Sequence, residues 1–253
     1  MDLSLAALTL SGYLLALGRT VGFVLVSPPF NTRAIPRQVR AVTAFTLAIP
    51  TSVWTTPSAP PLGSGAMLGQ MLLQMLLGLA MGYFVLMAVA AIQTIGDFID
   101  LAGGFSITQG LDPLSMVQSS VMGRLHQLVA ITLLFAADGH LVILRGLSRT
   151  FEIAAVATMD LSEVAETLTK MLATMFVSAI QITAPILAAL LIADVALGLL
   201  TRAAPALNAF ALAFPLKIIM SLFLIGLILV QIPGALEQFV NTAGMAMIRL
   251  VGG

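Results

Sequence analysis

The sequence predicts an all-helical protein that crosses a membrane several times. Of its 253 residues, 59% are apolar and only 9% are charged, whereas soluble domains carry roughly 25% charged residues. Too few polar side chains remain to cover a folded surface, so much of that surface must face lipid or other apolar protein. The apolar residues form long unbroken runs, such as Ile218 to Val230, which favours membrane helices over the alternating pattern of membrane strands.

Six apolar segments, separated by proline, glycine and charged residues, are the predicted helices. They run approximately over Leu3–Val26, Ala41–Trp54, Ala66–Ile95, Val121–Leu144, Met171–Ala193 and Phe210–Ile232. The second segment is short for a span, which needs roughly 20 residues. We expect residues 1–253 to form one domain.

Prolines and charges make the later segments irregular. Pro185 is expected to break the fifth segment and Asp194 to close it, while Pro205, Pro215 and Lys217 interrupt the approach to the sixth. Irregular helices with internal charges are tolerated at membrane depth only where other protein covers them or water reaches them. We therefore expect broken helices and hairpins inside a hetero-oligomer, rather than a free-standing bundle.

Three charges in this region are candidate buried structural residues, namely Asp194, Arg202 and Lys217. Asp194 and Arg202 lie eight residues apart, about 12 Å along a helix and too far for direct pairing. They could meet if the chain bends at Gly198, or each could bind a neighbouring subunit. Structural pairing is favoured over a role in proton flow.

The acidic residues near position 160 predict a helix start. Asp160 is a suitable cap, and Glu163 and Glu166 follow it within two turns. Acidic side chains are stabilising at this end of a helix because the backbone N–H groups there are unpaired.

The stretch from Gly96 to Ser120 differs from the rest of the chain. It contains Gly103 and Gly104, then Asp112 followed by Pro113, a combination typical of a helix start. We expect a helix, a loop over about residues 103–120, and a second helix. Composition leaves two interpretations open, a connecting loop, which composition alone favours, and a re-entrant plug that lines a pathway.

Several function classes are disfavoured. The 11 basic and 11 acidic residues balance, so no basic excess favours nucleic acid as a partner. Cysteine is absent and only two histidines, His126 and His140, occur, without a His-Glu-x-x-His motif. We therefore expect no enzyme activity, no metal site and no cofactor.

The middle of the chain reads GGFSITQGLDPLSMVQSSVMGRLHQLVAITLLFAADGHLVILRGLSRTF, with a glycine-Phe-Ser element, an Asp-Pro and a Gly-His. This stretch resembles the FliR family of flagellar export-gate proteins. The N-terminal Pro28-Pro29-Phe30 turn with Ile35-Pro36 and Arg40 is similar to the family as well. So is the C-terminal run from Pro185 through Asp194, Arg202, Asn208 and Phe214 to Lys217.

The resemblance implies a subunit of the flagellar type III export gate in the bacterial inner membrane, at the flagellar basal body. Such proteins assemble with FliP and FliQ into a helical hetero-oligomer, contact an FlhB-type protein and pass unfolded flagellar proteins. The family's pore plug maps here onto Gly104, Phe105, Ser106, Ile107, Thr108, Gln109, Gly110, Leu111, Asp112, Pro113, Leu114, Ser115 and Met116. A homologous gate of a virulence injectisome, and more distantly a small secondary transporter, are the alternatives.

Overall fold

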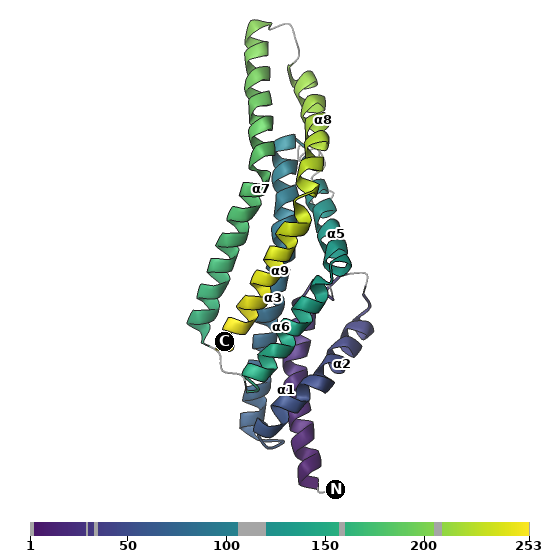
Figure 1. The fold of residues 1–253 in the computed structure, drawn as a ribbon, viewed down its shortest axis with the longest axis vertical. Coiled ribbons are helices and arrows are strands. Elements are labelled where there is room, and N and C mark those ends of the chain that lie inside the picture. Colours follow the sequence, from purple (N-terminus) through teal and green to yellow (C-terminus); the bar gives the residue numbers. More distant parts are fainter. Residues whose placement is uncertain are drawn as a thin grey trace. The chain divides into compact units, whose positions relative to one another are not determined.

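A computed structural model gives the fold of the chain and describes residues 3–28, 30–32, 35–105, 120–156, 160–204 and 209–252. Within these ranges every regular element is a helix, which confirms the predicted all-helical class (Figure 1). The elements are α1 (Leu3–Val26), α2 (Arg37–Thr55), the short 3₁₀ helix η1 (Thr56–Ser58), α3 (Gly65–Gly103), α5 (Val121–Ala136), α6 (Gly139–Ile153), α7 (Leu161–Ala203), α8 (Ala209–Leu229) and α9 (Ile232–Arg249).

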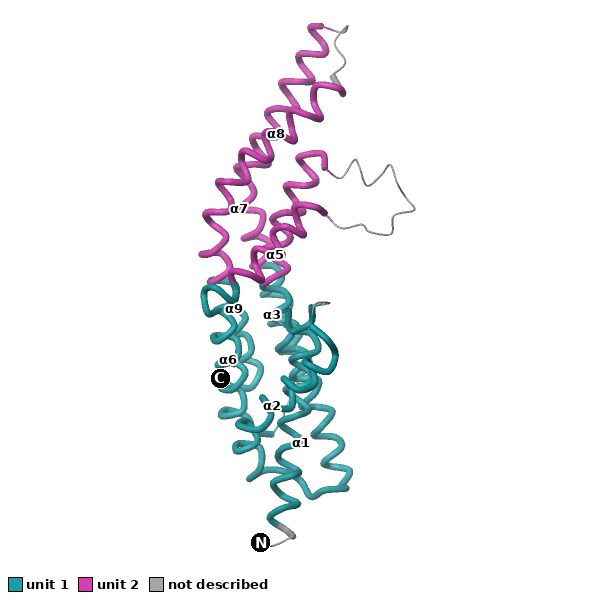
Figure 2. The backbone as a smooth tube through the Cα atoms, turned by 90° about the vertical axis from the view of Figure 1, so that its right-hand side faces the viewer, with its two compact units in different colours: residues 1–88, 134–173, 238–253 teal, residues 89–133, 174–237 magenta. Residues whose placement is uncertain are grey.

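The chain divides into two compact units, drawn in different colours in Figure 2. Unit 1 comprises residues 1–88, 134–173 and 238–253, and unit 2 comprises residues 89–133 and 174–237. Unit 1 therefore contains α1, α2, α6 and the part of α3 up to Ala88. It also contains the start of α7 and most of α9. Unit 2 contains the end of α3, most of α5, the second part of α7 and α8.

Glycines on α1 and α3 bring these two helices together in unit 1. Gly18 and Gly22 on α1 face the backbone of α3, and Gly78 and Gly82 on α3 face the backbone of α1. A Cβ added at Gly82 would lie 2.7 Å from the carbonyl oxygen of Phe23, which is closer than real Cβ atoms come. Small residues spaced four apart allow close backbone contact between membrane helices.

Helix α2 packs on α1 through small residues. Its buried positions are Ala44, Ala48, Thr51 and Thr55, and the hydroxyl of Thr55 donates a hydrogen bond of 2.7 Å to the carbonyl of Gly12. The larger apolar residues of α2, among them Phe45 and Ile49, are exposed. The small face is thus used for packing within the chain, and the bulky face is left for lipid or a partner.

In unit 2, α3 contacts both α5 and α8. Gly96 of α3 lies against the backbone of Met122 and Gly123 at the start of α5. Further along α3, a Cβ at Gly103 would lie 2.5 Å from the hydroxyl of Ser221 on α8. The last two turns of α3 therefore lie between two other helices.

The structure distinguishes the helices that could span a membrane from the others. Among the described residues, α1, α3, α7 and α8 are each long and apolar enough to cross a membrane, and α5 with α6 passes this test only as a pair bent by 72°. The predicted segment Ala41–Trp54 forms α2, whose many hydroxyl residues and two arginines lower its hydropathy. The predicted segment Val121–Leu144 bends near Asp138, which has a left-handed φ of 54° and so cannot continue a right-handed helix.

Two proline predictions were wrong. Helix α7 continues through Pro185 and past Asp194 to Ala203, and α8 contains Pro215 and Lys217. A proline removes one backbone N–H donor, and a long apolar helix can absorb this loss by local adjustment of its backbone. The predicted start of α7 is confirmed, because the carboxylate of Asp160 accepts a 2.8 Å hydrogen bond from the backbone N–H of Ser162.

Candidate functional site

The helix ends that flank the predicted plug are well defined. Helix α3 ends at Gly103, and Gly104 follows with φ +82°, a left-handed conformation that suits glycine at the end of a helix. On the other side Ser120 caps α5, since its hydroxyl accepts a 2.7 Å hydrogen bond from the N–H of Gly123. Gly104 and Phe105 are described, whereas the other plug positions, Ser106 to Met116, lie outside the described residues.

Buried polar side chains lie next to these helix ends. Asp100 on α3 is 2% exposed, and neither carboxylate oxygen has a hydrogen-bond partner among the described residues. His126 on α5 is buried and its Nδ1 lies 2.8 Å from the carbonyl oxygen of Met122. Asp97, which shares a helical face with Asp100, interacts electrostatically with His126. These groups give the ends of α3 and α5 a polar interior in otherwise apolar surroundings.

The two histidines and the acidic residues of the described ranges were also compared as possible metal ligands. In the part of the chain that the structure describes, no three histidine, cysteine, aspartate or glutamate residues are grouped so that they could hold a metal ion.

Two of the three candidate structural charges, Asp194 and Lys217, form an ion pair with each other. Asp194 Oδ1 lies 2.6 Å from Lys217 Nζ, which joins α7 to α8. Helix α7 has no break at Gly198, so Arg202 stays two turns away from Asp194 on the same helix. Within the chain these charges are not deeply buried, since Arg202 is exposed, the Asp194 side chain is 46% exposed and Lys217 is 19% exposed.

A buried arginine organises unit 1. Arg19 on α1 is fully buried and donates hydrogen bonds to Gln74 Oε1 (2.6 Å), to the carbonyl of Thr150 (2.9 Å) and to the carbonyl of Ala154 (2.7 Å). Its guanidinium carbon also lies 4.1 Å from the centre of the Phe151 ring. Thr150 and Phe151 are in the last turn of α6, where the unpaired carbonyl groups carry partial negative charge. The end of α6 thus serves as the counter-charge for Arg19.

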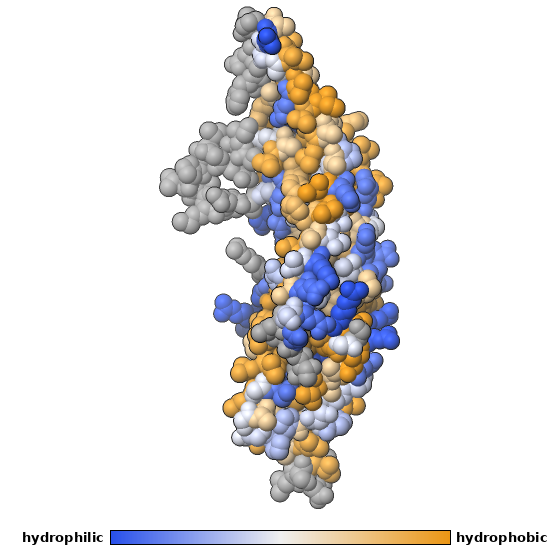
Figure 3. Space-filling model, turned by 90° about the vertical axis from the view of Figure 1, so that its left-hand side faces the viewer, coloured by the Kyte–Doolittle hydropathy of each residue, from blue (hydrophilic) through white to orange (hydrophobic). Residues whose placement is uncertain are grey.

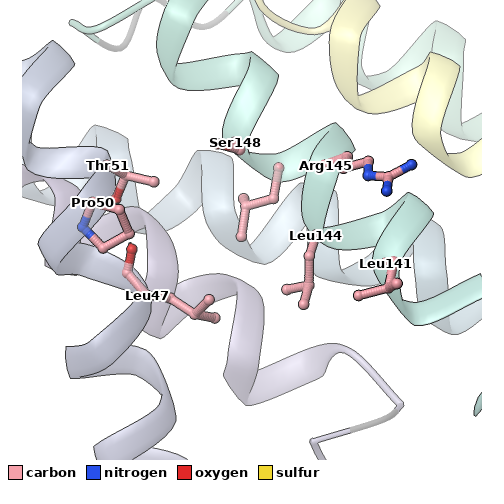
Figure 4. Close-up of a pocket in the computed structure, with 8 residues that line it drawn as sticks. Leu47, Pro50, Thr51, Leu141, Leu144, Arg145 and Ser148 are labelled. Atoms are coloured by element: carbon pink, nitrogen blue, oxygen red, sulfur yellow. Dashed lines mark hydrogen bonds between the residues drawn. The ribbon is translucent and has the colours of Figure 1, made fainter. Parts of the chain in front are cut away.

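A cleft lies between α2 and α6 in unit 1 (Figure 4). It has a volume of about 240 Å³ and is lined by Leu47, Pro50, Thr51, Leu141, Leu144, Arg145, Leu147 and Ser148. The Arg145 guanidinium points away from α2, at the outer edge of the cleft. Sequence reasoning did not find this site, although Pro50 inside an apolar helical segment was a visible irregularity.

The apolar surface is distributed unevenly. In the most apolar part of each helix, the share of residues buried within the chain is 56% for α1 and 61% for α3. The corresponding share is only 17% for α7 and 11% for α8. Apolar colour dominates the upper part of the face in Figure 3, where the second half of α7 lies, and its exposed residues include Leu191, Ile192 and Val195. Helices α7 and α8 therefore need lipid or other protein around them.

Known proteins resemble this chain over most of its length. The model of the family described as bacterial export proteins, family 1, matches residues 10–243. The flagellar biosynthetic protein FliR of Bacillus subtilis (strain 168) is 31% identical over 220 residues, which is 84% of each chain. The FliR protein of Escherichia coli (strain K12) is 29% identical over 211 residues, 81% of this chain and 79% of that protein. The surface presentation of antigens protein SpaR of Shigella sonnei is 24% identical over 148 residues, 58% of this chain and 57% of that protein.

Proposed function

Because the chain belongs to the FliR family of bacterial export proteins, we propose that it is the FliR subunit of a flagellar export gate. The coarser role, a membrane component of a type III secretion export apparatus, follows directly from family membership. The observation that carries the finer proposal is the 31% identity to a FliR protein over 84% of both chains. The match to SpaR is weaker and shorter, so the injectisome is the second candidate.

The proposed partners are the FliP and FliQ homologues, with an FlhB homologue in contact with the assembly. This part of the proposal is supported by α7 and α8, whose apolar surfaces are left almost uncovered by the chain itself. Two helices that expose bulky side chains such as Phe176 and Phe223 gain stability when neighbouring apolar helices pack against them. We place the assembly in the bacterial inner membrane at the flagellar basal body.

We assign the role of pore plug to Gly104–Met116. Its support is the flanking geometry, in which α3 ends at Gly103 and α5 begins at Val121, together with the mixture of small, hydroxyl and bulky apolar residues between them. Such side chains can seal a pathway and move aside without gripping charged cargo. The proposed role requires no bond-making or bond-breaking by the protein, so no catalytic residue is assigned.

A deletion tests the plug. The full gate complex that lacks Gly104–Met116 should leak small ions across the membrane at rest, measured as loss of the membrane potential in living cells. A deletion of Ala59 and Pro60, in the connection before α3, is the matched control and should not leak. A plug-deleted complex that assembles, secretes and holds ions as tightly as the native complex would refute the assignment.

Two further outcomes separate the candidate functions. A flagellar gate subunit should restore swimming when produced in its own host after deletion of the native gene, while an injectisome subunit should restore secretion of virulence proteins and leave swimming absent. A small transporter should be active without FliP and FliQ homologues.

A further inference from the structure

The cleft between α2 and α6 combines apolar walls with a single cation at its edge. Leu47 and Pro50 of α2 lie across it from Leu144 of α6, and Leu147 also lines it. Arg145 is exposed and has no carboxylate partner among the described residues. No acidic residue lines the cleft. Its chemistry therefore suits an amphipathic molecule with one anionic end.

A charge on the neighbouring turn strengthens the preference for an anion. Arg149 lies one turn beyond Arg145 on α6 and is exposed. Glu152, also exposed, is the acidic residue closest in sequence to Arg149 and lies two turns from Arg145. The net charge of these three residues is positive, which attracts the anionic headgroups of a bacterial membrane.

The volume argues against a partner helix as the occupant. The volume of about 240 Å³ is well above that needed for a single water and fits a stretch of one acyl chain. A helix with side chains is about 10 Å across and cannot enter. A free inorganic phosphate could contact Arg145 but would leave the leucines of the cleft uncovered.

We propose that this cleft binds one anionic phospholipid, with part of an acyl chain between Leu47 and Leu144 and the phosphate at Arg145. Pro50 contributes its ring to the lining of the site and has no backbone N–H to donate within α2. The bound lipid joins α2 to α6 where side chains of the protein leave space between them.

Lipid retention measures this binding. The full chain, purified in mild detergent, is incubated with phosphatidylglycerol or with phosphatidylcholine of the same acyl chains, washed, and examined by native mass spectrometry. The native chain should retain phosphatidylglycerol about fivefold better than phosphatidylcholine, the effect expected for one basic residue near an anionic headgroup. Arg145→Gln should remove this preference, whereas Arg249→Gln, an exposed arginine on α9, should keep it.

A second pair of variants tests the acyl-chain part. Leu144→Trp fills the cleft and should reduce the retention of both lipids, whereas Val142→Trp, on the same helix but outside the lining, should not. Equal retention of both lipids by the native chain, or a preference that survives Arg145→Gln, would overturn the proposal. Displacement of the lipid by millimolar inorganic phosphate alone would identify a simple anion site and overturn it as well.

Discussion

Arg19 on α1 and Gln74 on α3 share a 2.6 Å hydrogen bond and together bind the C-terminal end of α6. Arg19 donates to the carbonyl groups of Thr150 and Ala154, and Gln74 Nε2 donates to the carbonyl of Ala155 at 2.8 Å. An arginine inside an apolar segment would be very costly without partners. Here the side-chain amide of Gln74 and the carbonyl groups at the end of α6 accept the hydrogen bonds of the Arg19 guanidinium.

Removal of Gln74 should therefore destabilise the chain. Gln74→Leu leaves the Nε of Arg19 and the carbonyl of Ala155 without their partners, at a cost of about 2–3 kcal/mol in the free energy of unfolding. Denaturant unfolding of the purified protein in detergent measures this change. Arg249→Gln, an exposed control, should stay within about 0.5 kcal/mol of the native chain. A Gln74→Leu protein as stable as the native one would mean that the bonds of Arg19 contribute little.

The glycine contacts predict that substitution by alanine changes the stability of the chain differently at two positions. Gly78→Ala should destabilise by about 1–3 kcal/mol, because the added methyl group meets the backbone of Arg19 and Phe23. Gly226→Ala on α8, where a Cβ has nothing within 4 Å, should be neutral or stabilising by up to about 1 kcal/mol. The same unfolding measurement compares them. Equal effects at both positions would show that α1 and α3 are not in close contact.

The ion pair between Asp194 and Lys217 predicts a specific rescue. Asp194→Lys should weaken the hairpin of α7 and α8 by placing two cations together, and adding Lys217→Asp should restore it, with a coupling of about 1 kcal/mol for a partly exposed pair. Protein yield from the membrane and thermal stability are the readouts. The combination Asp194→Arg with Arg202→Asp should not rescue, and a full rescue by it would favour a pairing of Asp194 with Arg202 instead.

The start of α7 should respond to acid in a defined way. Hydrogen bonds from the side chain and backbone of Ser162 lower the pKa of Asp160. The stabilisation by this cap is therefore complete above the pKa of an unfolded aspartate, about 3.9, and is lost as the pH falls through the lower folded value. Carbon-13 NMR of labelled aspartate in the full chain measures the titration. Ser162→Ala should move the pKa of Asp160 upward, and an unchanged titration would contradict this cause.

The fold class was predictable from the sequence because hydropathy is a property of local segments. Both ends of α1 and the starts of α3 and α5 lie close to their predicted positions, since prolines, glycines and capping residues mark them. Helix α3 continues past the predicted end at Ile95 to Gly103, where the expected loop begins. Helix α9 was missed because Glu237, Gln238, Asn241 and Thr242 interrupt its apolar residues. Its helical periodicity, rather than an apolar run, was the signal available.

The contacts between helices were less predictable. The spacing of Gly18 with Gly22 and of Gly78 with Gly82 could be read from the sequence, but not that the two pairs meet each other. The partner of Asp194 depends on how α7 and α8 align, which no local pattern determines. The bend between α5 and α6 could have been predicted. Ala137-Asp138-Gly139 is a turn sequence inside an apolar segment.

Co-purification tests the proposed gate role most directly. The chain, carrying an affinity tag and produced in its host from its own gene, is extracted in mild detergent, and the proteins bound to it are identified and quantified. The account predicts a stable complex with FliP and FliQ homologues in fixed proportion, in which α7 and α8 are protected from labelling at introduced cysteines. A functional chain that leaves the membrane alone, as a monodisperse monomer, would contradict it.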